Sequence, residues 1–186
     1  MDPIDILMQE HRLIERMLKV LTVIAEQAEV VEVDIETFEK AIDFIRNFSD
    51  KFHHAKEEGE LFPLIESKGI PKDGGPIGMM LQEHDVGRNY VKGMDDSLHK
   101  YKAGDKSQAS EISRNALGFV NLLAEHIMKE DNILYPMGNR VLSDQERISL
   151  VKRFKEKEAK EVDKGIPEKY HNIVNELEKK FNISLY

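Results

Sequence analysis

The sequence predicts an all-α protein, an up-down four-helix bundle with additional C-terminal helices. Hydrophobic residues recur at spacings of three and four along four long segments, which is the period of an amphipathic helix. Connections containing Gly, Pro or Asp separate the segments, and no stretch has the alternation of a strand. We therefore divide the chain into a bundle, residues 1–141, and a charged helical extension, residues 142–186.

Each predicted segment has a recognisable start. Asp2 followed by Pro3, then Asp34, and then Asp105 after Gly104 are residue types that begin helices. Connections this short between amphipathic helices favour antiparallel neighbours in an up-down arrangement. The hydrophobic stripes run over Ile4–Ala28, Phe38–Phe52, Ile77–Leu98 and Ile112–Ile133.

The extension has its own start signals. Ser143 and Glu146 form a capping box ahead of a strongly charged helix, and Pro167 begins a last helix. We expect these helices to pack on the bundle or on a partner chain. A homodimer or another partner bound through residues 143–186 follows from the second alternative.

Composition excludes several classes of partner. The net charge is −8 and basic residues form no cluster, so we expect no nucleic acid and no anionic membrane surface as partners. No apolar run approaches the roughly 18 residues that span a bilayer. The first residues, MDPIDILMQEH, have neither the basic nor the apolar region of a signal peptide. We therefore expect a cytoplasmic protein.

The chain contains no cysteine. Thiolate catalysis, iron–sulfur clusters and cysteine-based zinc sites are thereby excluded for its own residues. Any metal must be held by histidine and carboxylate, which suit zinc, iron or manganese.

The chain contains an internal repeat. HHAKEEGELFP, residues 53–63, matches HIMKEDNILYP, residues 126–136, at an offset of 73. The same offset relates His11 in MQEH to His84 in LQEH. The bundle therefore consists of two similar helix pairs, each with one histidine on its first helix and H-x-x-x-E on its second.

This repeat predicts a metal site. Residues four apart lie one turn apart on one helical face, so each H-x-x-x-E presents an imidazole and a carboxylate together. Six donors are more than one tetrahedral zinc needs, whereas two metals with bridging carboxylates use all six and keep positions for an exogenous ligand. The predicted ligands are His11, His53, Glu57, His84, His126 and Glu130.

Three histidines lie outside the repeat. His54 has Ile127 as its counterpart, and a phase of about 100° per residue turns it away from the metal. We expect His54, together with His99 and His171, to be solvated.

Other charged residues leave alternatives. Asp131 is a rival to Glu130, because a carboxylate five residues after His126 could also reach a bridge. Lys56 and Lys129 are expected to be helix-surface charges.

The motifs resemble those of the hemerythrin-like family, also called HHE cation-binding domains. The resemblance rests on QEH at residues 9–11, HHAKEEGELFP, QEHDVGR at residues 82–88 and HIMKEDNILYP, and it covers roughly residues 1–140. It implies a non-haem di-iron site in a four-helix bundle, with the ligands above and either Glu130 or Asp131. It further implies two iron ions bridged by carboxylates and by an oxo or hydroxo group, with zinc or manganese as alternatives.

The chain departs from oxygen-carrying members of that family. They have a second histidine one turn after the third-helix histidine, where this chain has Arg88. The missing nitrogen implies an additional open position, which favours reaction or sensing over oxygen carriage. Cluster-repair relatives typically carry a cysteine-bearing N-terminal segment, which this chain lacks.

These features predict a di-iron protein that binds, senses or reacts with O2, peroxide or nitric oxide. The expected partner is accordingly a small diatomic or peroxide ligand. The alternatives are a di-iron oxidoreductase that reduces these molecules, an iron-handling or repair protein, and a protein whose metal only holds the bundle together.

Overall fold

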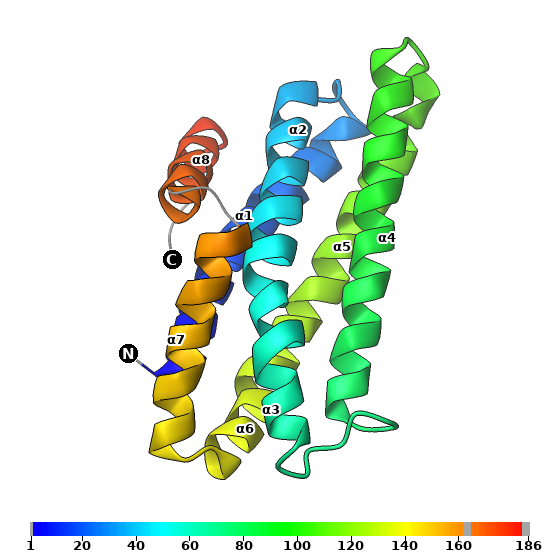
Figure 1. The fold of residues 1–186 in the computed structure, drawn as a ribbon. Coiled ribbons are helices and arrows are strands. Elements are labelled where there is room, and N and C mark those ends of the chain that lie inside the picture. Colours follow the sequence, from blue (N-terminus) through cyan, green and yellow to red (C-terminus); the bar gives the residue numbers. More distant parts are fainter. Residues whose placement is uncertain (1, 162–164, 184–186) are drawn as a thin grey trace.

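A computed structural model describes residues 2–161 and 165–183, and within them it forms an antiparallel bundle of four long helical rods (Figure 1). Around the bundle the rods follow in the order α1, the rod that contains α2, then α4, then the rod that contains α5. Two further helices cover one side. No strand is found in the described part of the chain, which confirms the predicted all-α fold. The first rod is α1 (Pro3–Ala28); the second is α2 (Ile35–Phe44), η1 (Ile45–His54), η2 (Glu57–Leu61) and α3 (Phe62–Glu66); the third is α4 (Pro76–Lys102); the fourth is η3 (Lys106–Gln108), α5 (Ala109–Lys129), η4 (Glu130–Leu134) and α6 (Tyr135–Val141); α7 (Asp144–Glu161) and α8 (Ile166–Lys180) follow.

The predicted helix starts are confirmed by side-chain caps. The Asp2 carboxylate accepts a hydrogen bond from the Ile4 amide at 2.9 Å, and Asp34 accepts one from the Thr37 amide at 3.1 Å. Each cap satisfies an amide that has no partner inside the helix. The Ser143 amide donates to Glu146 at 2.9 Å while Glu146 donates its amide to the Ser143 hydroxyl at 3.4 Å, as the capping box predicts.

The rods are not α-helical throughout. The segments η1, η2 and η4 are π-helical, and Glu57 and Glu130 begin two of them at equivalent positions of the repeat. A π-helix bonds residue i to i+5 and winds more slowly than an α-helix. The phase of 100° per residue therefore does not hold around His53 and His54.

Two hydrophobic clusters fill the bundle, one toward each end. One contains Leu13 and Phe52, and the other contains Leu7 and Leu61. Each rod contributes to both, so the segment between them on every rod is held in place from two sides. His11, His53 and His84 lie in those intermediate segments, and His126 lies at the edge of the first cluster, next to Ile127.

The C-terminal helices pack on the bundle of the same chain. Leu150 and Phe154 of α7 join the cluster that contains Leu7, and Tyr170 of α8 lies against Phe44 with ring centroids 5.5 Å apart. Packing on the bundle is thus one of the two predicted arrangements, and association through residues 143–186 stays a prediction.

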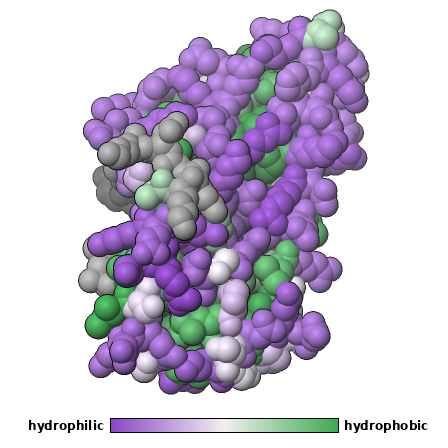
Figure 2. Space-filling model, viewed as in Figure 1, coloured by the Kyte–Doolittle hydropathy of each residue, from purple (hydrophilic) through white to green (hydrophobic). Residues whose placement is uncertain are grey.

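The surface is mostly charged. On the face shown in Figure 2, hydrophobic atoms are exposed as a strip between the polar flanks of α2 and α4. Among the helices that the structure describes, none is long and apolar enough to cross a membrane.

Phe154 tests the docking of α7. Its side chain is 1% exposed, so Phe154→Ala should lower the free energy of unfolding by about 3–5 kcal/mol through loss of burial and the cavity left behind. Ile148 on the same helix is 73% exposed, and Ile148→Ala should change it by less than about 0.5 kcal/mol. Denaturant unfolding of both variants measures the difference. Equal small effects would contradict the docking of α7.

Candidate metal centre

The structure brings the six predicted ligands together in the middle of the bundle. All are buried, with exposed fractions of 0–2%. Oε2 of Glu57 lies 3.6 Å from His53 Nε2 and 3.7 Å from His84 Nε2. Oε2 of Glu130 lies 3.3 Å from His11 Nε2 and 3.2 Å from His126 Nε2. Each carboxylate therefore reaches a histidine of both helix pairs.

This arrangement is that of two half-sites joined by carboxylates. His11 and His53 form one half, with ring centroids 4.6 Å apart, and His84 and His126 form the other, with centroids 4.7 Å apart. In the second half the two Nε2 atoms are 3.1 Å apart. Two nitrogen ligands at right angles on one ion, with bonds of about 2.0–2.1 Å, lie about 3 Å apart.

A carboxylate outside the cluster contacts the other ring nitrogen of each of these histidines. Such partners fix the ring orientation and direct Nε2 inward. They obey the repeat: Glu10 and Glu83 are 73 residues apart, as are Glu58 and Asp131. The Nδ1 contacts are His11 with Asp131 at 2.7 Å, His53 with Glu10 at 2.9 Å, His84 with Glu58 at 2.7 Å and His126 with Glu83 at 3.0 Å.

Glu130 and Asp131 occupy different places. The Glu130 carboxylate is fully buried among the Nε2 atoms, whereas Asp131 lies behind His11 and also binds Arg12. Because Glu130 begins a π-helical segment, adjacent residues of the chain face opposite sides of the His11 ring. Glu130 thus lies between Nε2 atoms of both half-sites, where a bridging ligand would lie. Asp131 lies on the outer side of His11 and supports that ring.

Several buried polar atoms at the centre are suited to bind a cation. Among the described residues, no hydrogen-bond partner is found for His53 Nε2, Glu57 Oε2 or either oxygen of Glu130. Burial, together with the negative charge of Glu130, raises the pKa of Glu57 well above its usual value. Buried carboxylates without partners are costly, and a metal ion satisfies both their charge and their lone pairs. The donor set therefore fits a pair of divalent or trivalent ions.

The carboxylates of the centre also shift the pKa of His126. Burial opposes the charge of His126, but the nearby carboxylates of Glu130 and Glu83 outweigh it and raise the pKa of His126 to about 9. A metal ion entering this half-site has to displace that proton.

His54 is not solvated, and this prediction was wrong. Its exposed fraction is 6%, and its ring stacks on His84 with centroids 3.8 Å apart and planes inclined by 14°. Burial, together with His84, lowers the pKa of His54 to about 3. The segment η1 is π-helical, so the phase of 100° per residue on which that prediction rested does not apply to His53 and His54. His99 and His171 are exposed, as predicted.

Lys56 is also buried, contrary to its prediction as a surface charge. Its exposed fraction is 0%, and its ammonium binds both Glu10 and Glu158, the latter at 2.7 Å. It also lies 3.6 Å from the ring centroid of Phe52. Since Glu10 holds His53, the helix α7 is linked to the centre through Glu158, Lys56 and Glu10.

Tyr135 adds to the centre a polar group that is not among the six predicted ligands. Its hydroxyl donates to Glu57 Oε1 at 2.5 Å and lies 3.4 Å from His11 Nε2. Its counterpart at the offset of 73 is Phe62, whose ring lies over His84 with centroids 6.2 Å apart. This difference in the aligned motifs, F against Y, is the signal in the sequence that a hydroxyl is present beside one half-site only.

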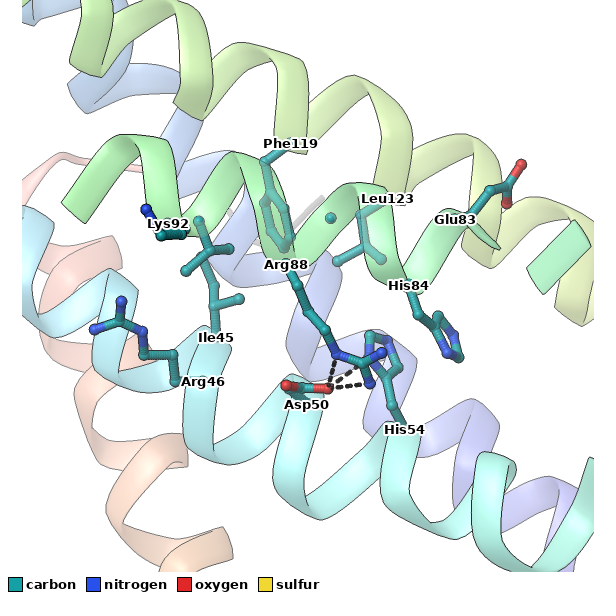
Figure 3. Close-up of a pocket in the computed structure, with 12 residues that line it drawn as sticks. Ile45, Arg46, Asp50, His54, Glu83, His84, Arg88, Lys92, Phe119 and Leu123 are labelled. Carbon is teal, nitrogen blue, oxygen red and sulfur yellow. Dashed lines mark hydrogen bonds and ion pairs between the residues drawn. The ribbon is translucent and has the colours of Figure 1, made fainter. Parts of the chain in front are cut away.

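A cavity of about 190 Å³ approaches the centre from the surface between η1 and α4. Its walls are mostly apolar and include Ile45 and Phe119, and charged residues such as Arg88 and Lys92 also line it. His54 and His84 lie at one end of it (Figure 3). Arg88 reaches across from α4 and binds Asp50 and Glu58, each at 2.7 Å. Arg88 thus supports two carboxylates that lie outside the cluster.

Comparison with known proteins gives distant relatives. The chain is 21% identical over 181 residues to uncharacterized proteins of Mycobacterium tuberculosis and Mycobacterium bovis, covering 95% of this chain and 69% of each relative. It is 32% identical over 108 residues to the iron-sulfur cluster repair protein YtfE of Edwardsiella ictaluri. That match covers 56% of this chain and 47% of the relative.

A family model matches the chain over most of its length. The model of the hemerythrin HHE cation-binding domain matches residues 2–138, which contain all six predicted ligands. This confirms the resemblance seen in the motifs. The paired half-sites, their outer carboxylates and this match together show that the chain belongs to the hemerythrin HHE cation-binding family.

Proposed function

We propose that this protein holds two iron ions in the centre and binds, senses or reacts with O2, peroxide or nitric oxide. One observation carries the proposal: the Glu57 and Glu130 carboxylates each lie between histidines of both half-sites, within 3.2–3.7 Å of their Nε2 atoms. Two ions in these half-sites would share both carboxylates, with two imidazoles of the repeat on each. Iron suits such mixed ligation, and zinc or manganese are the competing metals.

The protein's own residues prepare the site for such chemistry. When bound, two iron ions supply Lewis-acid and redox chemistry toward small ligands. The outer carboxylates hold the proton on each Nδ1, so that Nε2 keeps its lone pair for a metal. The hydrophobic clusters at both ends exclude water. The Tyr135 hydroxyl fixes Glu57 and is the nearest proton donor to the His11 half-site.

Iron handling in cluster repair is a second candidate function. The observation that favours it is the similarity to an iron-sulfur cluster repair protein over 108 residues. Because this chain has no cysteine, the cluster would belong to a client protein. Transfer of iron from the loaded protein to a client with a damaged cluster would separate this candidate from ligand sensing. We also propose a cytoplasmic location, on the composition alone.

Metal content and spectra test the main proposal. Protein purified without oxygen and loaded with Fe(II) should retain two ions per chain and develop visible absorption on exposure to O2, peroxide or nitric oxide. Repeated turnover with an electron donor would identify an oxidoreductase rather than a sensor. Retention of a single ion, or two ions without a spectral response to any of these ligands, would contradict the proposal.

Glu130 and Asp131 have different expected effects. Glu130→Gln removes a shared anionic ligand and should reduce tightly bound metal to one ion or none per chain. Asp131→Asn loses only outer support for His11, so it should keep both ions with affinity lowered by about 10–100-fold or less. Metal analysis after desalting compares the two variants. The opposite ranking would make Asp131 the bridging residue.

Metal affinity should fall as the pH is lowered. In the metal-free protein the pKa of His126 is about 9, so below that value a proton must leave before the metal binds. Each unit of pH lost between about pH 8 and about pH 6 should weaken binding by about tenfold for this one proton. Competition with a chelator of known pH dependence measures the slope. Glu83→Gln removes one carboxylate that raises this pKa, so in that variant the weakening should begin at a lower pH, whereas an unchanged onset would contradict the explanation.

A further inference from the structure

Each of the four outer carboxylates is itself bound by a cationic side chain. A cation that holds such a carboxylate in place also helps to fix the imidazole that the carboxylate supports. The pairs are Glu10 with Lys56, Glu83 with Lys129, Asp131 with Arg12 and Glu58 with Arg88. Three of these cations reach solvent, with side chains 24–54% exposed, whereas the side chain of Lys56 is 1% exposed.

Lys56 differs from the other three cations because α7 covers it. Helix α7 lies against α1, η1 and η2 (Figure 1), and its Glu158 binds the Lys56 ammonium at 2.7 Å. A buried ammonium is costly unless carboxylates compensate its charge, and here Glu10 and Glu158 do so together. One ammonium thus connects α1, the second rod and α7.

The repeat provides an internal comparison. In each half one lysine binds Oε1 of the outer glutamate while the histidine contacts Oε2 of the same carboxylate. Lys129, the counterpart of Lys56, binds Glu83, and no second carboxylate is found for it in the described part of the chain. The connection to the C-terminal extension is therefore an addition to the half that contains His53.

We propose that Glu158 is a positioning residue of the half-site formed by His11 and His53, and that the docking of α7 and metal binding in that half-site stabilise each other. Glu158 holds the Lys56 ammonium, Lys56 holds one oxygen of Glu10, and the other oxygen of Glu10 orients the His53 ring. Coupling between two binding events is reciprocal, so a metal that needs His53 in place also favours the docked α7. The effect on metal binding rests on the proposed two-metal centre, whereas the orientation of His53 does not.

A double-mutant cycle tests this path. Glu158→Gln keeps the size of the side chain but removes its charge, and should weaken Fe(II) loading by about tenfold, the lower end of the range for a direct outer partner. In a Glu10→Gln background the same change should have little further effect, because Glu158 acts through Glu10. In a Glu83→Gln background, the equivalent change in the other half-site, it should keep its full effect.

Anaerobic competition with a chelator measures these affinities. The control is Glu156→Gln, which removes a charge from the same helix at a side chain that is 54% exposed, and which should load as wild type does. Equal effects of Glu158→Gln in the Glu10→Gln and Glu83→Gln backgrounds would overturn the path through Glu10. An effect of Glu158→Gln no larger than that of Glu156→Gln would overturn the role of Glu158 altogether.

Metal-free protein tests the positioning by itself. In NMR spectra the Nδ1 proton of His53 should exchange faster with water in Glu158→Gln than in wild type, whereas that of His126 should exchange as before. Unchanged exchange at His53 would contradict the positioning role. Wild-type protein that holds fewer than two ions would overturn the two-metal centre, and faster exchange at His53 would still support the role of Glu158.

A measurement on wild-type protein covers the case in which Glu158→Gln does not fold. On metal loading, hydrogen exchange of the backbone amides should slow more in α7 than in α8. Helix α8 is the internal control, because none of its described residues forms an ion pair with an outer carboxylate. Equal slowing in the two helices would contradict the coupling between α7 and the centre.

Discussion

The burial of two carboxylates at the centre of the bundle is the constraint on which the rest of the structure depends. Glu57 and Glu130 are fully buried, and the imidazoles around them cannot neutralise both charges and also remain neutral ligands. A cation between the half-sites resolves this conflict. The outer carboxylates, the buried lysine and the hydrophobic clusters then follow as the groups that hold the donors in position for that cation. Without a cation, the centre would hold buried carboxylate oxygens of Glu57 and Glu130 that have no hydrogen-bond partner among the described residues.

The bundle is a repeat whose two halves have diverged at the centre. The shared parts are the imidazole and carboxylate donors and their outer carboxylates, which all recur at an offset of 73. Among the differences between the halves, two change polar groups beside the half-sites: His54 against Ile127, and Tyr135 against Phe62. The donors are thus repeated, but the groups that surround them in the two half-sites are not.

The fold and the six donors could be predicted because they follow from local rules and from the repeat. Helical periodicity located the rods, and the offset of 73 selected His53 over His54 as the equivalent of His126. The burial of His54 could not be predicted that way, because it depends on π-helical winding that the repeat does not reveal. The burial of Lys56 depends on Glu158, 102 residues later, which no local pattern connects to it.

The ion chain from Glu158 through Lys56 to Glu10 has a consequence for the order in which the site is completed. Chains are synthesised and begin to fold from the N-terminus, so every donor of the centre emerges before α7 does. Until then Lys56 has only Glu10 to neutralise it, and the support of His53 is open to water on the side that α7 later covers. The helix α7 thus covers the support of His53 only after all six donors have been made, and until then that side of the centre is more accessible to a metal ion.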